Sequence, residues 1–353
     1  MYAVFGRQPS KCVWLGALLG LGLFVVASAD QAVAAPLAIT GAGATFPAPL
    51  YQKWISEYSA RNLGITIAYR AIGSGDGVKR FIAGDVDFGA SDSAMSDEQI
   101  ARVGRGAQLV PATAGMVVLA YNVKGLNGAL RLPRKVYVDI FAGKIRRWND
   151  PQIVQANPGI DFPAKDITIV ARQDGSGTTY AFTNHLSAVS SEWRDRGPGV
   201  GSAVDWPGNA MVARGNEGVA SRIKMSDGAI GYVEYGFAKR LGLPMALLEN
   251  RAGRFVAPDA EAGRRAFQDN LSDMPSNLRV FLPDPEGDSS YPIVTLSWLL
   301  LYREHPNPKV AAALKAFVSW GLTEGQRIGE SMGYVPLPVE LVALSKAAVA
   351  ALE

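Results

Sequence analysis

Short apolar segments typical of strands alternate along the chain with segments of helical periodicity. The strand-like segments span residues 65–69, 86–90, 117–123, 167–170, 229–233 and 293–302. Apolar residues at helical spacing mark helices near residues 50–58, 78–82, 180–186 and 310–318. Strands that alternate with helices predict an α/β fold with largely parallel sheets. Because the alternation continues through two halves of the chain, we expect two doubly wound lobes.

Two pairs of polar residues have the spacing of a capping box, in which a Ser or Thr and a Glu or Gln three residues later cap a helix. Ser96 with Gln99 predicts one helix start, and Thr323 with Gln326 predicts another. We find no repeat of fixed short period and no low-complexity tract.

The first residues have the layout of a secretory signal peptide. Arg7 and Lys11 precede an apolar run over residues 13–27, and residues 27–29 then form a small-residue cleavage site. A transmembrane anchor is the alternative, but the run contains three glycines and is short for a span of about 20 residues. We therefore expect residues 1–29 to be a cleaved signal peptide and the mature protein to be periplasmic.

Removal of this segment changes the composition. Cys12, the only cysteine, would be lost, so the mature chain would have no disulfide and no cysteine nucleophile. Cleavage after Ala29 leaves 324 residues, with 33 basic and 32 acidic side chains, while a second small-residue site ends at Ala35. This balance argues against binding to nucleic acid or attachment to a membrane through a basic surface.

Three glycine-containing turns that begin predicted helices have the composition of anion sites. In an open α/β sheet, ligands bind beyond the carboxyl ends of strands, where such turns lie. The first turn spans residues 41–49, where the amides of Thr45 and Phe46 would point out of the helix start beside the Thr45 hydroxyl. The second spans residues 73–77 and offers the hydroxyl and amide of Ser74.

The third turn, residues 172–179, follows a predicted strand and opens a helix. Ser176, Gly177 and Thr178 would present amides and two hydroxyls, and Arg172 would supply a charged, bidentate donor. A helix N-terminus has unpaired N–H groups and about half a positive charge, so it can hold an anion without a metal. One such turn usually caps an ordinary helix, but three in one chain favour an oxyanion site that needs no cofactor.

An acidic residue after the strand at 86–90 restricts which anion fits. An ionised carboxylate only accepts hydrogen bonds, so Asp92 beside an anion is favourable only if the anion carries a proton. Phosphate keeps an O–H near neutral pH and sulfate does not, so the carboxylate would reject sulfate. The alternative is that Asp92 caps the helix near Ser96.

The sequence gives little support for catalysis. His185 and His305 are the only histidines, and we expect each to be a surface or capping residue rather than a general base. The chain lacks a Gly-x-Ser-x-Gly elbow, a Gly-x-x-x-x-Gly-Lys-Ser/Thr phosphate loop and a His-Glu-x-x-His motif. We expect a binding protein rather than an enzyme. A phosphatase-like hydrolase, a binder of another oxyanion and a surface or adhesion protein are the alternatives.

Together these segments resemble the periplasmic phosphate-binding proteins of the phosphate ABC transporter, which have the type II periplasmic-binding-protein fold. The matching segments are residues 41–49, 72–78, 86–92, 174–178, 215–218 and 228–235. The resemblance covers about residues 37–345 and implies high-affinity binding of dehydrated phosphate between two lobes joined by a hinge. It also implies delivery to the permease and ATPase subunits of a membrane transporter, by a protein that is a monomer before docking.

The resemblance implies lobe boundaries and site residues. Lobe I would comprise residues 30–115 and 292–353, and lobe II residues 116–291. The implied phosphate-binding residues are Thr45, Phe46, Ser74, Asp92, Arg172, Ser176, Gly177 and Thr178, with Asp92 accepting the phosphate proton and with Asp174 and Gly75 in support.

One turn departs from the family pattern. The family often has Gly-Ser-Ser-Gly-Gly here, whereas Gly75 and Asp76 occupy the third and fourth positions of this chain. Asp76 either adds a negative charge near the site or points outward as a cap.

Overall fold

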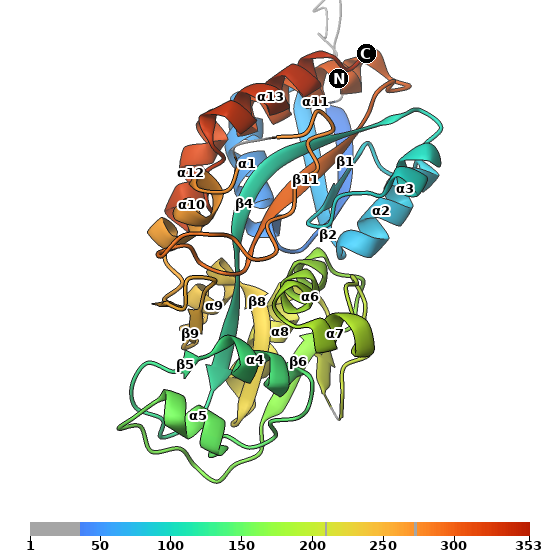
Figure 1. Ribbon diagram of the computed structural model, residues 1–353. Coiled ribbons are helices and arrows are strands. Elements are labelled where there is room, and N and C mark those ends of the chain that lie inside the picture. The colour runs from blue at the N-terminus through green and yellow to red at the C-terminus, as the bar shows by residue number, and fades with distance from the viewer. Residues whose placement is uncertain (1–35, 209, 272–273) are drawn as a thin grey trace, which may run out of the picture. The chain divides into compact units, whose positions relative to one another are not determined.

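The computed structural model describes residues 36–208, 210–271 and 274–353, and Pro36–Glu353 forms one compact unit. An eight-stranded sheet in the order β2-β1-β3-β11-β4-β8-β6-β7 runs through this unit (Figure 1). Its strands are β1 (Leu37–Gly43), β2 (Ile65–Ala71), β3 (Phe88–Ser91), β4 (Ala107–Asn122), β6 (Thr168–Arg172), β7 (Met211–Ala213), β8 (Ala229–Glu234) and β11 (Val294–Tyr302). A smaller sheet contains β5 (Arg131–Leu132), β9 (Leu247–Glu249) and β10 (Phe255–Val256).

Helices connect the strands and cover the sheet. They are α1 (Ala48–Arg61), α2 (Ser74–Ala83), α3 (Asp97–Ala101), α4 (Arg134–Phe141), α5 (Pro151–Ala156), α6 (Gly177–Val189), α7 (Ser191–Arg196), α8 (Gly215–Met225), α9 (Tyr235–Arg240), α10 (Ala260–Gln268), α11 (Pro308–Gly321), α12 (Glu324–Met332) and α13 (Val339–Ala350). Figure 1 shows α1 and α11 to α13 on one side of the upper strands, with α2 and α3 on the other. The predicted α/β class is therefore confirmed.

The sheet is parallel at its two ends and antiparallel in its middle. β1 pairs in parallel with β2 and β3, and β6 pairs in parallel with β7 and β8. Between them β11 pairs antiparallel with β3 and β4, and β4 pairs antiparallel with β8. The expectation of largely parallel sheets thus holds for the outer strands only.

Strand β4 is longer than the sequence pattern predicts. It starts at Ala107 rather than near Val117, and it contains Pro111, a residue that normally argues against a central strand. The pairing register with β11 shifts between Ser297 and Trp298, opposite Thr113 and Pro111, so a bulge accommodates the proline. The first part of β4 pairs with β11 and its last part pairs with β8, so this strand joins the two halves of the sheet (Figure 1).

Glycines allow two C-terminal helices to pack closely on α1. The indole Nε1 of buried Trp54 donates to the carbonyl of Gly325 at 2.8 Å. A Cβ atom added to Gly321 or Gly325 would lie 2.7 Å from this indole, which is closer than van der Waals contact allows. This packing holds α1 and the turn before it against the sheet.

One predicted cap is confirmed and the other is wrong. The Ser96 side chain accepts from the Gln99 amide, and the Gln99 side chain accepts from the Ser96 amide, as in a capping box. Thr323 instead donates its hydroxyl to the carbonyl of Trp320, at the end of the preceding helix, and Gln326 donates to the carbonyl of Ala112. The two side chains thus form hydrogen bonds with neighbouring elements rather than capping the start of α12.

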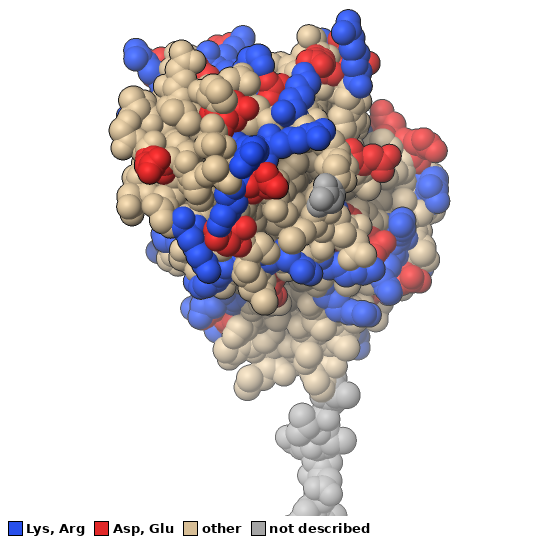
Figure 2. Space-filling model, turned by 90° about the horizontal axis from the view of Figure 1, so that it is seen from below, with Lys and Arg blue, Asp and Glu red and all other residues tan. Residues whose placement is uncertain are grey.

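The predicted signal peptide, residues 1–29, lies outside the described residues. Among the helices that the structure describes, none combines the length and apolar character needed to cross a bilayer. Figure 2 shows basic and acidic side chains interspersed on one face of the molecule, as the near balance of charge in the sequence suggests.

Candidate functional site

The first predicted turn lies between β1 and α1 and has two backbone amides available to a ligand. α1 begins at Ala48, whose amide donates to the Thr45 carbonyl at 3.3 Å. Phe46 is fully buried, and its carbonyl accepts from the Tyr334 hydroxyl at 2.8 Å. Within the described residues, the amides of Thr45 and Phe46 have no protein acceptor. They lie just before a helix start, as predicted.

The second turn joins β2 to α2, which begins at Ser74. The Ser74 hydroxyl accepts from the amide of Asp92 at 3.3 Å and lies 3.4 Å from the Asp92 carboxylate. Gly75 donates its amide to the carbonyl of Gly175 in the third turn at 2.9 Å. The second turn therefore contacts both the acidic residue and the third turn.

Asp76 of the second turn contacts a lysine of its own helix. Its side chain is about half exposed and forms an ion pair with Lys79, 3.3 Å away, on the next turn of α2. The acid lies in the first turn of the helix, where it complements the helix dipole. It also lines a cavity that borders the site, so its negative charge is near the site.

The third turn begins α6 at Gly177, with Ser176 as the N-cap. The Ser176 hydroxyl accepts from the Thr179 amide at 3.1 Å. The Ser176 amide donates to the carbonyl of Ser202 at 2.8 Å, so the expectation that this amide faces an anion is wrong. The amides of Gly177 and Thr178 have no protein acceptor in the part of the chain that the structure describes. This turn thus offers two amides and the proton of the Ser176 hydroxyl.

Arg172 lies at the end of β6 and is only 7% exposed. Its guanidinium pairs with Asp174 through both Nε and Nη2, the first at 2.9 Å, and Nη1 donates to the Thr178 hydroxyl at 3.4 Å. The Gly215 amide donates to Asp174 at 3.0 Å. Burial alone would raise the pKa of Asp174, but the hydrogen bonds and charge of Arg172 and the Gly215 amide lower it. Asp174 therefore remains ionised and holds the guanidinium in place.

Asp92 follows β3 and is 1% exposed. Burial raises its pKa to about 7, although hydrogen bonds from Ser297 and Ser74 and the charge of Arg172 oppose the change. The Ser297 hydroxyl of β11 donates to Oδ1 at 2.8 Å. Asp92 does not cap α3, because Ser96 has that role.

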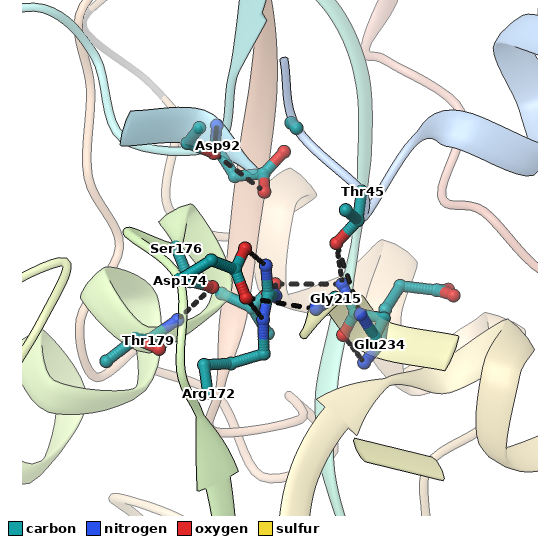
Figure 3. A network of polar contacts seen from close by, with 12 residues as sticks. Thr45, Asp92, Arg172, Asp174, Ser176, Thr179, Gly215 and Glu234 are labelled. Atoms are coloured by element: carbon teal, nitrogen blue, oxygen red, sulfur yellow. Dashed lines mark hydrogen bonds and ion pairs between the residues drawn. The ribbon is translucent and has the colours of Figure 1, made fainter. Parts of the chain in front are cut away.

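The three turns and Asp92 meet at one place. A Cβ atom added to Gly177 would lie 2.5 Å from the Asp92 Cβ and 2.7 Å from the Ser74 hydroxyl. Only a residue without a side chain permits this approach. Figure 3 shows Asp92 and Thr45 on one side of the site, facing Arg172, Asp174 and Ser176 on the other. Segments far apart in the sequence therefore place amides, hydroxyls, one guanidinium and two carboxylates together.

A cavity of about 770 Å³ borders the site. Thr45, Asp174 and Asn216 line it on the side of the site, and Lys79 and Arg214 lie elsewhere along its wall. The cavity wall carries both basic and acidic side chains, so its electrostatic potential is not uniformly positive along the path of an anion to the turns.

Asn216 at the start of α8 is a site residue that the sequence did not assign. It is fully buried, and its side-chain Nδ2 donates to the hydroxyls of Thr45 at 3.0 Å and Thr178 at 3.1 Å. Its Oδ1 accepts from the Glu234 amide at 2.9 Å. Residues 215–218 match the family, but no local pattern indicates which hydroxyls the asparagine contacts.

Ser297 and Glu234 were also not assigned. Ser297, like Thr295, is a buried hydroxyl residue within a mainly apolar strand, and this was the one available signal. Glu234 caps α9 by accepting from the amides of Gly236 and Phe237. Burial raises its pKa to about 7, opposed by these hydrogen bonds and supported by the charge of Asp92.

The histidines lie away from the turns. His185 is fully buried in α6 rather than at the surface, so that expectation is wrong. Its ring nitrogens contact the Tyr137 hydroxyl at 2.8 Å and the Pro283 carbonyl at 2.6 Å, and burial lowers its pKa to about 4. His305 lies in a loop, where its Nδ1 accepts from the Asn307 amide at 3.1 Å. In the described residues no cluster of three metal-ligating side chains is found.

Solved structures share this fold. A high-affinity periplasmic phosphate-binding protein with bound phosphate superposes with a TM-score of 0.73 at 22% identity, over 88% of this chain and 93% of that protein. A phosphate-binding protein from Stenotrophomonas maltophilia gives a TM-score of 0.73 at 20% identity over the same shares. These similarities confirm the periplasmic-binding-protein fold.

Sequence comparisons identify the family. The family model described as a PBP superfamily domain matches residues 28–324. The phosphate-binding protein PstS of Pasteurella multocida is 41% identical over 86% of this chain and 87% of its own. The PstS protein of Haemophilus influenzae is 40% identical over 87% of this chain and 91% of its own. The chain therefore belongs to the PstS family of phosphate-binding proteins within the PBP superfamily.

Proposed function

We propose that this chain binds inorganic phosphate with high affinity where the three turns meet. The observation that carries the proposal is the group of buried donors around Asp92. It comprises the free amides of the first and third turns, several hydroxyls and the guanidinium of Arg172. Fixed N–H dipoles at helix starts replace the hydration shell of an oxyanion without a metal.

Asp92 selects a protonated anion. An ionised carboxylate only accepts hydrogen bonds, so an anion beside it must donate one, and the O–H of phosphate does so. Sulfate has no proton to donate and meets a like charge in a buried site, which is unfavourable. The PstS names of the curated relatives support phosphate as the ligand.

We assign residues 30–115 and 292–353 to lobe I and residues 116–291 to lobe II. The donors before residue 115 then belong to one lobe, and those of the third turn belong to the other. All of them can reach one anion only when the lobes are closed. Phosphate therefore binds the closed form preferentially and shifts the population toward it.

The protein acts as a carrier rather than an enzyme. We propose that residues 1–29 direct export to the periplasm, where the chain, as a monomer, delivers phosphate to the permease and ATPase subunits of an ABC transporter. The membership of the PstS family supports this role. Both ring nitrogens of His185 are engaged by Tyr137 and Pro283, so neither is available as a general base.

Calorimetric titration of the purified mature protein with phosphate and sulfate tests the ligand. We expect tight binding of phosphate and no measurable heat with sulfate at neutral pH. Equal affinity for the two anions would overturn the assignment. A chromogenic phosphate ester serves as the test for hydrolysis, since turnover that disappears in Ser176→Ala would identify an enzyme instead.

A further inference from the structure

Asn216 occupies a position between two hydroxyls of the candidate site. Its backbone amide and its Nδ2 both donate to the Thr45 hydroxyl, at 3.2 and 3.0 Å. The same Nδ2 donates to the Thr178 hydroxyl at 3.1 Å, where Arg172 Nη1 is a second donor at 3.4 Å. In Figure 3, dashed lines from the oxygen of Thr45 mark the first of these contacts.

The orientation of the Asn216 amide is determined by its other partner. The Glu234 backbone N–H lies 2.9 Å from the opposite side-chain atom of Asn216. A backbone N–H can only donate, so that atom must be the carbonyl oxygen, and the atom facing the threonines must be the NH₂ group.

Each threonine hydroxyl has two acceptor lone pairs and one proton. At Thr45 both lone pairs are taken by Asn216, and at Thr178 they are taken by Asn216 and Arg172. Across the described ranges, neither hydroxyl donates its proton to a protein acceptor. The remaining capacity of both groups is therefore that of a donor.

We propose that Asn216 is a positioning residue that sets the polarity of the site, making the hydroxyls of Thr45 and Thr178 obligatory donors toward the anion. This inference rests on the proposed phosphate-binding function. Without Asn216 each hydroxyl could rotate and present a lone pair to the anion, which is repulsive. Thr45 belongs to the proposed lobe I and Asn216 to lobe II, so the Thr45 hydroxyl acquires this polarity only when the lobes close.

A double-mutant cycle tests the proposal, with phosphate affinity measured by calorimetry. Asn216→Ala is expected to weaken binding by about 10- to 100-fold in the native background. In a background carrying Thr45→Val and Thr178→Val, the same change should cost no more than about threefold, because the hydroxyls through which it acts are gone. A similar loss in both backgrounds, or no loss in the native one, overturns the proposal.

A separate measurement controls for loss of folding in the variants. Asn216→Ala leaves the Glu234 amide without its acceptor, so urea unfolding in phosphate-free buffer accompanies each titration. Where that variant does not fold, Asn216→Asp replaces it, because aspartate keeps the acceptor for Glu234 and offers the threonines an acceptor instead of a donor. The added charge of Asn216→Asp is present in both the native and the double-valine background, so comparing the two losses of affinity cancels its direct effect. We again expect a much larger loss in the native background.

Asn157 supplies the matched control. It is also a buried asparagine, but within the described residues its side chain bonds only to the backbone of Arg131 and Ile153. Asn157→Asp is expected to lower the free energy of unfolding and leave phosphate affinity unchanged. If the native protein fails to bind phosphate, the proposed function is wrong. If it binds and the cycle shows no coupling, the proposed function stands and the role of Asn216 is wrong.

Discussion

Replacing Asp92 with asparagine is expected to stabilise the unliganded protein at neutral and alkaline pH. The side chain is buried, and the change removes its charge while keeping its shape. The Ser297 hydroxyl can still donate to the amide oxygen, and the new NH₂ group faces the Ser74 hydroxyl, 3.4 Å from the present carboxylate oxygen. Asparagine therefore keeps a hydrogen bond to each of the two hydroxyls, while the Ser74 proton loses its present acceptor.

The magnitude follows from the pKa of Asp92. Burial raises this pKa from an ordinary 3.8 to about 7 in the folded protein. Between these values the folded protein binds the proton and the unfolded chain has lost it, so stability falls as the pH rises toward 7 and is constant above it. A difference of about three pH units, at about 1.4 kcal/mol each, corresponds to roughly 4 kcal/mol. A substitution that weakens ligand binding and stabilises the unliganded protein is typical of a binding site that contains a buried charge.

The assay is urea unfolding in phosphate-free buffer, since phosphate would itself stabilise the folded form. We expect the free energy of unfolding of Asp92→Asn, relative to the native protein, to increase by roughly 3 kcal/mol from about pH 5 to about pH 8. Taking the difference cancels the other titrating groups. Glu234, whose pKa is also raised to about 7, does not cancel fully because it is coupled to Asp92. The same comparison in a Glu234→Gln background measures how much of the pH dependence comes from Glu234. A difference that is flat across this range would refute the reasoning.

Two other substitutions and the anion selectivity of Asp92→Asn test the site. Arg172→Ala should weaken phosphate binding by a few kcal/mol, because a charge-assisted donor is lost, and an unchanged affinity by calorimetry would remove Arg172 from the site. Asp92→Asn should weaken phosphate binding less than it relaxes the rejection of sulfate, and the ratio of the two dissociation constants measures this. Gly177→Ala should weaken phosphate binding by about 10- to 100-fold, because the added Cβ would lie 2.5 Å from the Asp92 Cβ. Gly64→Ala is the matched control and should bind normally, because among the described residues no atom beyond its chain neighbours lies within 4 Å of the added Cβ.

Local sequence patterns predicted the parts of the site that lie within one turn. Glycine, serine and threonine before an apolar helix indicated the amides of Thr45, Phe46, Gly177 and Thr178, because a helix start leaves such groups unpaired whatever surrounds it. The fold class followed from the same local alternation. Even so, Pro111 concealed the first part of β4, since the bulge that accommodates a proline depends on the partner strand.

Contacts between distant segments could not be predicted in this way. The Ser176 amide is taken by Ser202, which lies in a loop after the helix, and Ser297 reaches Asp92 from a strand some 200 residues later. Asn216 looks like an ordinary polar residue at a helix start until the fold brings it beside Thr45. Hydrogen-bond capacity is counted per atom, so the role of each hydroxyl depends on partners that only the folded chain supplies.

The raised pKa of Asp92 links the choice of anion to pH. An anion that donates a hydrogen bond to the carboxylate stabilises the ionised form of Asp92. An anion without a proton meets a like charge there and favours the protonated form. Sulfate therefore binds only together with a proton on this side chain. Its weak affinity should be constant well below pH 7, where Asp92 is already protonated, and should fall up to about tenfold for each pH unit above about 7. Asp92→Asn should abolish this dependence. Competition of sulfate with phosphate, measured by calorimetry across this range, tests the coupling. A sulfate affinity that stays constant from about pH 7 to about pH 9 would mean that the carboxylate does not face the anion.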